Sequence, residues 1–323
     1  MDRKQQLIEV FEDTQKFYNE NIALKAAIEF GRKHTVIYSE NEYPILPVLG
    51  SVETLSVMAD DDNGSLSVQA YATEAVAQIE AGLPFDPVVH GREVRVTKHK
   101  TFEAAMALHK EFPNKKIAVL NFASAVQPGG GVKHGSSAQE ESLCRCSTLF
   151  PTIDRKWLWQ SYYDVNRAKK DVRHSDACIY SPGVIICKTD DSIPQRMEPK
   201  DFVTVDVISC AAPNLRDEPA NFHNPETGAP VKMDPTELYE LHIKRAEHIL
   251  HIAAYNNVDI LILGAFGCGA FCNDPNTVAS AYRDALINYI GRFDLVEFAI
   301  YCRDYETENF DAFNKALTFC WFN

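Results

Sequence analysis

The chain has 323 residues, and its 45 acidic against 32 basic residues give a net charge of −13, which argues against general nucleic-acid binding because that function needs a basic surface. It contains no run of 18 apolar residues, so we expect no membrane-spanning helix and no membrane partner. Its nine cysteines are scattered and odd in number, which favours reduced thiols and a cytoplasmic location, or a nuclear one in a eukaryotic cell.

The first 85 residues differ in pattern from the rest of the chain. Apolar residues recur at helical spacing between residues 3 and 33, which predicts two helices broken near Asn19-Glu20-Asn21. Residues 34 to 62 are expected to be extended or irregular, and residues 72 to 81 to form a short helix. We therefore predict that residues 1–85 form a mainly helical accessory segment packed on the main domain.

Residues 86–323 alternate between strand and helix patterns, which predicts an α/β three-layer sandwich with a mixed β-sheet flanked by helices. The expected strands are a short one around Val94 and Val96, Lys116 to Asn121, Ile179 to Cys187, Phe202 to Cys210, Val258 to Leu263 and Leu295 to Cys302. The expected helices are Thr101 to Glu111, Gln139 to Leu149, Asp154 to Val165, Thr236 to Tyr255, Pro275 to Tyr289 and Glu306 to Phe319.

A glycine loop follows the apolar strand that begins at Lys116. The strand leads through Asn121 to three consecutive glycines, Gly129, Gly130 and Gly131. Glycine lacks a Cβ atom, so such a loop can adopt positive φ angles and approach a ligand closely. Loops of this kind bind phosphates or sugars through their backbone N–H groups.

Gln139, Glu140 and Glu141 come soon after these glycines. Ser137, followed three positions later by Glu140, has the capping-box pattern, which places these three residues in the first turn of a helix. Two adjacent carboxylates beside a glycine loop would suit acid catalysis at a sugar. The alternative is that Glu140 only caps the helix and interacts with its dipole.

A second glycine loop follows the strand that ends at Leu263. The next helix begins at Pro275, with Asp274 as its expected N-cap. The glycine spacing fits neither a dinucleotide fingerprint nor a P-loop. The loop could hold an anion on backbone N–H groups, or it could be a plain strand-to-helix turn. Its candidate binding residues are Gly267, Cys268, Gly269, Ala270 and Phe271.

The string NFASAVQPGGGVKHGSSAQEE resembles the signature of poly(ADP-ribose) glycohydrolases, in which three glycines precede Gln-Glu-Glu, and in particular that of their microbial branch. The resemblance covers about residues 86 to 323 and implies a macrodomain-like fold. It implies hydrolysis of the ribose–ribose O-glycosidic bonds of poly(ADP-ribose), with that polymer or ADP-ribosylated protein as substrate and ADP-ribose as product. It also implies that the second loop binds a diphosphate and that Phe271 lies against the distal ribose.

The resemblance also implies roles for residues of the first loop. Glu141, the second glutamate of the signature, would protonate the leaving hydroxyl and later activate water. Glu140 would hold the ribose hydroxyls, and Gln139, Asn121 and the glycines Gly129–Gly131 would bind substrate. Adjacent helical residues diverge by about 100°, so both carboxylates reach one ligand only at a helix end. We expect neither a metal nor another cofactor.

Two other stretches were considered for the site. Ser209 to Asn214 leaves a strand end, where α/β sheets tend to bind ligands, so this segment is a candidate wall of the site. Cys144 and Cys146 do not predict a zinc site, because residues two apart on a helix face different directions.

Two alternative functions share these features. One is a non-catalytic macrodomain that binds ADP-ribose through the same two loops. The other is a mono-ADP-ribosyl hydrolase that acts on modified protein or nucleic acid. A binding protein has no need of a carboxylate at Glu141, so this residue favours an enzyme.

Overall fold

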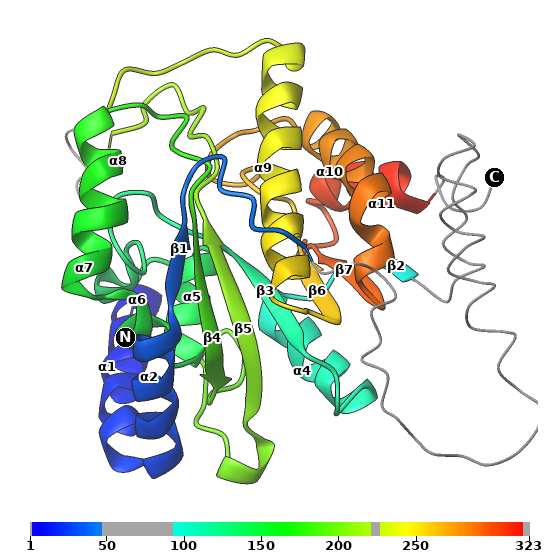
Figure 1. Ribbon diagram of the computed structural model, residues 1–323. Helices are drawn as coiled ribbons and strands as arrows, with labels where there is room; N and C mark the ends of the chain where they lie inside the picture. The colour runs from blue at the N-terminus through cyan, green and yellow to red at the C-terminus, as the bar shows by residue number, and fades with distance from the viewer. Residues whose placement is uncertain (1, 47–92, 221–226, 319–323) are drawn as a thin grey trace, which may run out of the picture.

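The computed structural model describes residues 2–46, 93–220 and 227–318. Within them a seven-stranded mixed sheet lies between layers of helices, which confirms the predicted α/β sandwich (Figure 1). The strands are β1 (Val36–Tyr38), β2 (Glu93–Thr97), β3 (Ile117–Phe122), β4 (Cys178–Ile186), β5 (Val203–Cys210), β6 (Ile260–Leu263) and β7 (Leu295–Ala299).

The order of strands in the sheet is β1-β4-β5-β3-β6-β7-β2. Strands β5, β3, β6, β7 and β2 run parallel to one another, whereas β4 is antiparallel to β5 and β1 is antiparallel to β4. The carboxyl ends of the parallel strands therefore meet at one edge of the sheet. Open α/β sheets bind their ligands at this edge, in the loops that follow the strands.

Helices cover both faces of the sheet. Their bounds are α1 (Arg3–Glu20), α2 (Ile22–His34), α4 (Thr101–Glu111), α5 (Gln139–Cys146), α6 (Leu149–Ile153), α7 (Lys156–Leu158), α8 (Asp164–Lys169), α9 (Pro235–Tyr255), α10 (Pro275–Tyr289) and α11 (Glu308–Thr318). Within the described residues, none of the helices has both the length and the apolar content that a membrane span needs.

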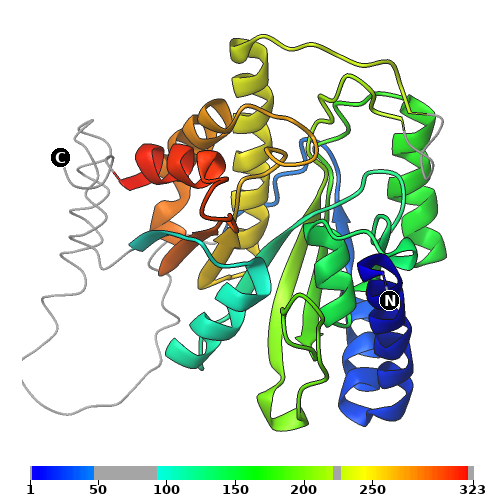
Figure 2. The ribbon, with the colours of Figure 1, turned by 180° about the vertical axis from the view of Figure 1, so that it is seen from behind.

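The central strand β3 shows how the two cores are divided. Ala118 and Leu120 face one buried cluster, which includes residues of α9, α10 and α11. Ile117 and Val119 face a second cluster, with residues of α4, α5 and α6. This alternation follows from the two-residue period of a strand. Figure 1 shows the α9 face, and Figure 2, turned by 180°, shows the face with α4 and α5.

The N-terminal helices are docked on the part of the chain that carries the glycine loop. The predicted break is confirmed, because α1 ends at Glu20 and the side chain of Asn21 caps α2. Thr14 Oγ1 donates to the carbonyl of Arg145 (2.7 Å), and the Tyr18 hydroxyl donates to that of Ser147 (2.6 Å). Strand β1 extends the sheet by pairing with β4. The boundary at residue 85 stays a prediction, and the predicted helix at 72–81 lies outside the described residues.

The helix predicted from Gln139 to Leu149 is wrong only at its end. It ends at Cys146, and α6 begins only at Leu149. Ser147 is extended, with φ −148° and ψ 175°, and it forms a β-bridge with Ile186. The carbonyl of Cys146 accepts the N–H groups of Cys187 (2.8 Å) and Lys188 (3.1 Å). Pairing with the end of β4 thus replaces the helical hydrogen bonds.

Other predicted bounds agree within a few residues. Helices α4 and α10 begin and end as predicted, and the segment predicted as a helix from Asp154 is helical from Lys156 to Lys169 with a π-helical turn at Trp159–Tyr163. Strand β7 ends at Ala299, three residues before the predicted end, and β6 begins two residues late. The predicted last residue of α11, Phe319, lies outside the described residues.

The cap of α2 yields a stability prediction. Asn21 Oδ1 accepts the N–H groups of Ala23 (2.9 Å) and Leu24 (3.2 Å). We expect Asn21→Ala to lower the free energy of unfolding by about 1 kcal/mol, because both donors lose their partner. Asn19→Ala, on the exposed last turn of α1, is the control and should leave stability unchanged. Equal urea midpoints for both variants and the parent would contradict this role of Asn21.

Candidate active site

A cavity of about 640 Å³ opens at the carboxyl edge of the sheet. Residues of the second glycine loop and Gln139 of α5 line it, whereas Gly129–Gly131, Glu140 and Glu141 do not. The fold thus places the second loop and the start of α5 at one cavity. The lining residues that matter here are Phe122, Gln139, Ala212, Gly267, Gly269 and Phe271. Between the two regions, the rings of Phe122 and Phe266 pack edge to face with centroids 5.5 Å apart.

Gln139, Glu140 and Glu141 form the first turn of α5, as predicted. The predicted capping box is wrong, because Ala138 is the N-cap and α5 has no side-chain cap. The carboxylate of Glu140 instead accepts hydrogen bonds from the loop after β3. Its donors are Ser124 N (2.7 Å), Gly129 N (3.2 Å) and Asn121 Nδ2 (3.3 Å). Glu140 therefore binds the loop and does not cap its own helix.

Glu141 has one bonded and one free carboxylate oxygen. Its side chain is buried, with the residue 7% exposed, and Oε1 accepts the N–H of Gly131 (2.8 Å). Among the described residues, Oε2 has no hydrogen-bond partner. A buried polar atom without a partner is costly and needs an explanation, and proton transfer to a ligand provides one.

The glycine loop lies directly on this pair of carboxylates. Its N–H groups go to protein acceptors, since Gly129 and Gly131 donate to Glu140 and Glu141 and Gly130 donates to the carbonyl of Gln127 (3.3 Å). Gly130 has φ +50°, and a Cβ there would lie 2.6 Å from Glu141 Oε1 and 3.2 Å from Glu140 Oε2. Glycine is the residue that adopts this positive φ without strain and leaves room for the two carboxylates, because it has no Cβ atom.

Burial and charge shift the ionisation of the pair. Burial raises the pKa of Glu140 to about 8, with a further contribution from the neighbouring charge of Glu141. The hydrogen bonds from Ser124, Asn121 and Gly129 act in the opposite direction. One proton therefore stays on this pair near neutral pH, as expected for two carboxyls that share a buried site.

Gln139 and Asn121 connect the helix start to the end of β3. Gln139 Oε1 accepts Phe122 N (2.8 Å), and Nε2 donates to Leu120 O (2.7 Å) and Thr101 Oγ1 (3.1 Å). Asn121 is fully buried and donates to Ser209 Oγ (3.0 Å) as well as to Glu140. These contacts fix the position of the two glutamates, and the substrate contacts expected of Gln139 and Asn121 stay a prediction.

The second loop presents free donors to the cavity. In the part of the chain that the structure describes, the backbone N–H groups of Gly269, Ala270 and Phe271 have no protein acceptor, and all three residues line the cavity. The N–H of Cys268 differs, since it donates to Ala265 O (3.1 Å). The predicted cap is confirmed, because Asp274 accepts the N–H of Thr277 (2.7 Å) before α10.

Gly267 and Phe271 are fixed by their surroundings. Gly267 has φ +80°, and a Cβ there would meet Asn273 Nδ2 at 2.8 Å and Ala212 Cβ at 2.9 Å. The Phe271 ring lies below the guanidinium of Arg216, with 5.7 Å from Cζ to the centroid. Only a compact backbone at Gly267 therefore lets this loop pack against the segment after β5.

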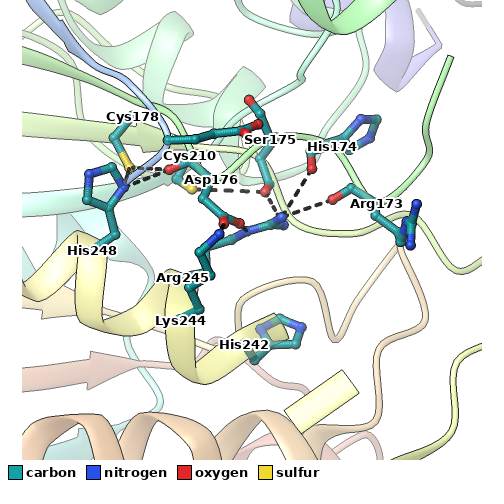
Figure 3. A network of polar contacts seen from close by, with 12 residues as sticks. Arg173, His174, Ser175, Asp176, Cys178, Cys210, His242, Lys244, Arg245 and His248 are labelled. Carbon is teal, nitrogen blue, oxygen red and sulfur yellow. Dashed lines mark hydrogen bonds and ion pairs between the residues drawn. The ribbon is translucent and has the colours of Figure 1, made fainter. Parts of the chain in front are cut away.

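A buried charge network supports the far wall of the site (Figure 3). Arg245 of α9 is fully buried, and its Nε donates to Asp176 Oδ1 (2.8 Å). Its other nitrogens donate to the carbonyls of Ala211 (2.8 Å), Arg173 (3.0 Å) and His174 (3.3 Å). Arg245 thus ties the segment before β4 to the segment after β5.

One turn earlier on α9, His242 Nε2 contacts Asn273 Oδ1 (2.8 Å), and Asn273 Nδ2 donates to Pro213 O (2.8 Å). The sequence analysis missed Asp176, His242 and Arg245. The available signal was the presence of polar residues at the core-facing positions of a helix that is otherwise apolar on that side.

Among the described residues, no group of three or more His, Cys, Asp or Glu side chains could hold a metal ion. Cys144 and Cys146, considered above, are buried free thiols.

Comparisons with known proteins agree with this geometry. Residues 4–189 match the family described as microbial-type PARG, catalytic domain, where PARG denotes poly(ADP-ribose) glycohydrolase. The matched range includes α1 and α2, which the sequence resemblance had left outside. No curated protein matches the chain.

Two solved structures illustrate the likeness. One is the glycohydrolase of Thermomonospora curvata bound to the inhibitor ADP-HPD, with a TM-score of 0.70, 23% identity, and coverage of 96% of this chain and 99% of that one. The other is the glycohydrolase of Deinococcus radiodurans in complex with ADP-ribose, with a TM-score of 0.63, 27% identity, and coverage of 91% of this chain and 98% of that one.

The raised pKa of Glu140 predicts a pH dependence of stability. The folded protein keeps this proton up to about pH 8, whereas the carboxyl of the unfolded chain loses it near 4.5. The native state then binds more protons between these values, so this group lowers the free energy of unfolding as the pH rises from about 5 to 8. Urea unfolding across this range should show the slope in the parent and lose it in Glu140→Gln. A constant stability difference between the two proteins would contradict the assignment.

Proposed function

The chain belongs to the microbial-type PARG catalytic-domain family, and we propose that Glu141 is the general acid and base with which it hydrolyses the ribose–ribose O-glycosidic bonds of poly(ADP-ribose). The observation that carries this proposal is the free Oε2 of Glu141. Gly131 fixes the other oxygen of the same carboxyl, so the free oxygen has a defined position at the start of α5.

Hydrolysis requires that one proton is donated to the leaving ribose hydroxyl and that one is removed from the attacking water. Cleavage passes through an oxocarbenium-like state at the anomeric carbon, and the leaving ribose hydroxyl needs a proton. Glu141 Oε2 donates that proton, and the ionised carboxylate then accepts a proton from the attacking water. Glu140 and Glu141 are adjacent on one helix turn, so they do not act as carboxylates on opposite faces of the sugar.

Glu140 has room for one contact with the sugar. A carboxylate offers about four acceptor positions. Three of those on Glu140 are used by Ser124, Gly129 and Asn121. The remaining position is open for a hydrogen bond from a ribose hydroxyl. Glu140 thereby holds the ribose while it also fixes the glycine loop.

The substrate must displace part of the glycine loop to reach the catalytic oxygen. Gln139 and Ser142 of α5 line the cavity, whereas the carboxylates of Glu140 and Glu141 are buried beneath Gly130. A loop of consecutive glycines has no side chains to move, but its shift breaks hydrogen bonds such as that from Gly131 N to Glu141 Oε1. We propose that a small shift of this loop admits the distal ribose.

The second loop is suited to the diphosphate. The N–H groups of Gly269, Ala270 and Phe271 carry no net charge and converge before the N-terminus of α10. Backbone donors at a helix N-terminus are a favourable anion site. We therefore assign the diphosphate to this loop and the distal ribose to the space between the two loops.

The wider context of the reaction follows from composition and burial. The substrate is poly(ADP-ribose) or ADP-ribosylated protein, and the product is ADP-ribose. The net charge of −13 does not suit general nucleic-acid binding. Buried free thiols, among them Cys144, Cys146 and Cys178, suit a reducing compartment, so we propose a cytoplasmic location.

The catalytic assignment is tested by Glu141→Gln. This change keeps the size of the side chain but removes the dissociable proton. General acid catalysis typically contributes about 10²- to 10⁴-fold, so release of ADP-ribose from polymer should fall by at least about 10²-fold. Affinity for ADP-ribose should persist, because the acid acts chiefly in the transition state.

Glu140→Gln is the matched comparison and should impair both turnover and affinity, since Glu140 holds the ribose. Parent-like turnover in Glu141→Gln would refute the catalytic role. Identification of the products separates the alternatives: a binding protein gives no product, and a mono-ADP-ribosyl hydrolase acts only on singly modified protein or nucleic acid.

The diphosphate assignment is tested by thermal unfolding with ligands. ADP-ribose at about 100 times its Kd should stabilise the protein by about 2.7 kcal/mol and raise the Tm accordingly. Adenosine lacks the diphosphate and the distal ribose, so it should raise the Tm much less. Equal shifts at equal concentration would mean that the phosphates are not recognised. ADP, as a third ligand, separates the phosphate contribution from that of the distal ribose.

A further inference from the structure

Three cation–aromatic pairs lie at the carboxyl edge of β2 and β7. Lys98 Nζ is 5.1 Å from the centroid of Phe310, and Lys100 Nζ is 5.7 Å from that of Tyr301. Arg303 Cζ is 5.8 Å from the centroid of Tyr305, and its Nη1 donates to the hydroxyl of the same tyrosine (2.9 Å). We call this set the basic–aromatic surface, and it comprises Lys98, Lys100, Tyr301, Arg303, Tyr305 and Phe310.

This surface is continuous with the cavity. β2 and β7 are neighbouring parallel strands, with Thr97 paired to Ala299. The segments that leave them carry Lys100 and Tyr301, which line the cavity, while Lys98, Arg303 and Tyr305 lie beyond its lining. Figure 1 shows α11, which carries Phe310, beside β7 and β2. The surface therefore begins at the cavity mouth and extends outward from it.

Two of the three rings are exposed, whereas Phe310 is partly buried against the core. Tyr301 is 59% exposed and Tyr305 is 75% exposed. Lys100 is held firmly, because its Nζ donates to the backbone carbonyl of Asp190, and the buried carboxylate of the same residue lies 3.9 Å away. Arg303 has only a surface ion pair, with Glu306 at 3.8 Å. Ion pairs of this kind stabilise little, so phosphates can replace them.

The composition of the surface fits a polymer of nucleotides. Sites for single-stranded nucleic acids combine aromatic rings, on which bases stack, with cations that follow the phosphates. Each unit of poly(ADP-ribose) carries an adenine and a diphosphate. A cavity of about 640 Å³ is of the size that holds one small ligand, so the neighbouring unit must lie outside it.

We propose that the basic–aromatic surface binds a second ADP-ribose unit of the polymer, next to the unit in the cavity. Tyr305 stacks its adenine, and Arg303 and Lys98 contact its diphosphate. The proposal rests on the proposed function and adds a reason for preferring polymer over a single ADP-ribose group. Its ligand is the polymer rather than RNA or DNA, because the surface leads directly into the ADP-ribose cavity.

The test compares ligands of different length. Binding is measured in the Glu141→Gln background, so that the polymer is not consumed, with ADP-ribose and with oligomers of at least two units. The double variant Arg303→Ala and Tyr305→Ala should weaken oligomer binding by about 10-fold, since stacking alone contributes about that much per base. ADP-ribose affinity should be unchanged. Loss of Arg303 should also reduce the salt dependence of oligomer binding.

Two control variants match these changes. Tyr305→Phe keeps the stacking ring and should bind the oligomer like the parent. Lys169→Ala removes an exposed cation from α8, at the opposite end of the molecule from β2 (Figure 1), and should also have no effect. If Lys169→Ala weakens oligomer binding as much as the double variant does, the effect is one of net charge and the proposal fails.

The remaining outcomes are distinguishable. Equal affinity of the parent for ADP-ribose and oligomer, or equal weakening of both ligands in the double variant, would overturn the proposal. A single-stranded DNA that displaces the oligomer at equal concentration would overturn the choice of polymer. Failure of the wild-type chain to hydrolyse polymer would instead refute the proposed function, and the binding result would still decide the role of this surface.

Discussion

The site depends on hydrogen bonds between the glycine loop and two buried carboxylates. Glu140 and Glu141 are only 3% and 7% exposed, and buried carboxyls persist when donors satisfy them. The donors are the backbone N–H groups of Gly129, Gly131 and Ser124. This pairing fixes the left-handed backbone of the loop, the start of α5 and the free oxygen of Glu141. The same hydrogen bonds therefore position the free oxygen of Glu141 and require glycine in the loop.

The opposite wall depends on a different buried charge. Arg245 is fully buried and joins Asp176 to three backbone carbonyls. Removing one partner of a buried ion pair is strongly destabilising, because the other charge remains without compensation. The pair therefore holds the segment after β5 against the second loop. It does so from α9, so the cavity is shaped by residues that never line it.

The features that were predictable from sequence are those set by neighbouring residues. Asn21 and Asp274 cap helices through donors two or three residues away, and the apolar run from Ile117 forms a strand whatever its partners are. What could not be predicted depends on distant pairing. Ser147 breaks a helix because it pairs with Ile186, and Glu140 bonds Ser124 across a loop. From the sequence alone, a role for Glu140 in a capping box was as good a prediction as a role in binding.

An acidic protein that binds a polyanion must do so through local donors, because its net charge repels the ligand. In the cavity, the donors that we propose for the diphosphate are the uncharged N–H groups of Gly269, Ala270 and Phe271, whose attraction for an anion needs no cation. Outside it, Lys98 lies over the partly buried ring of Phe310 and Arg303 lies beside the exposed Tyr305, where salt screens both charges. Binding of the reacting unit should therefore depend weakly on ionic strength, and capture of the polymer strongly. This division lets the enzyme hold its substrate while most of its surface repels other polyanions.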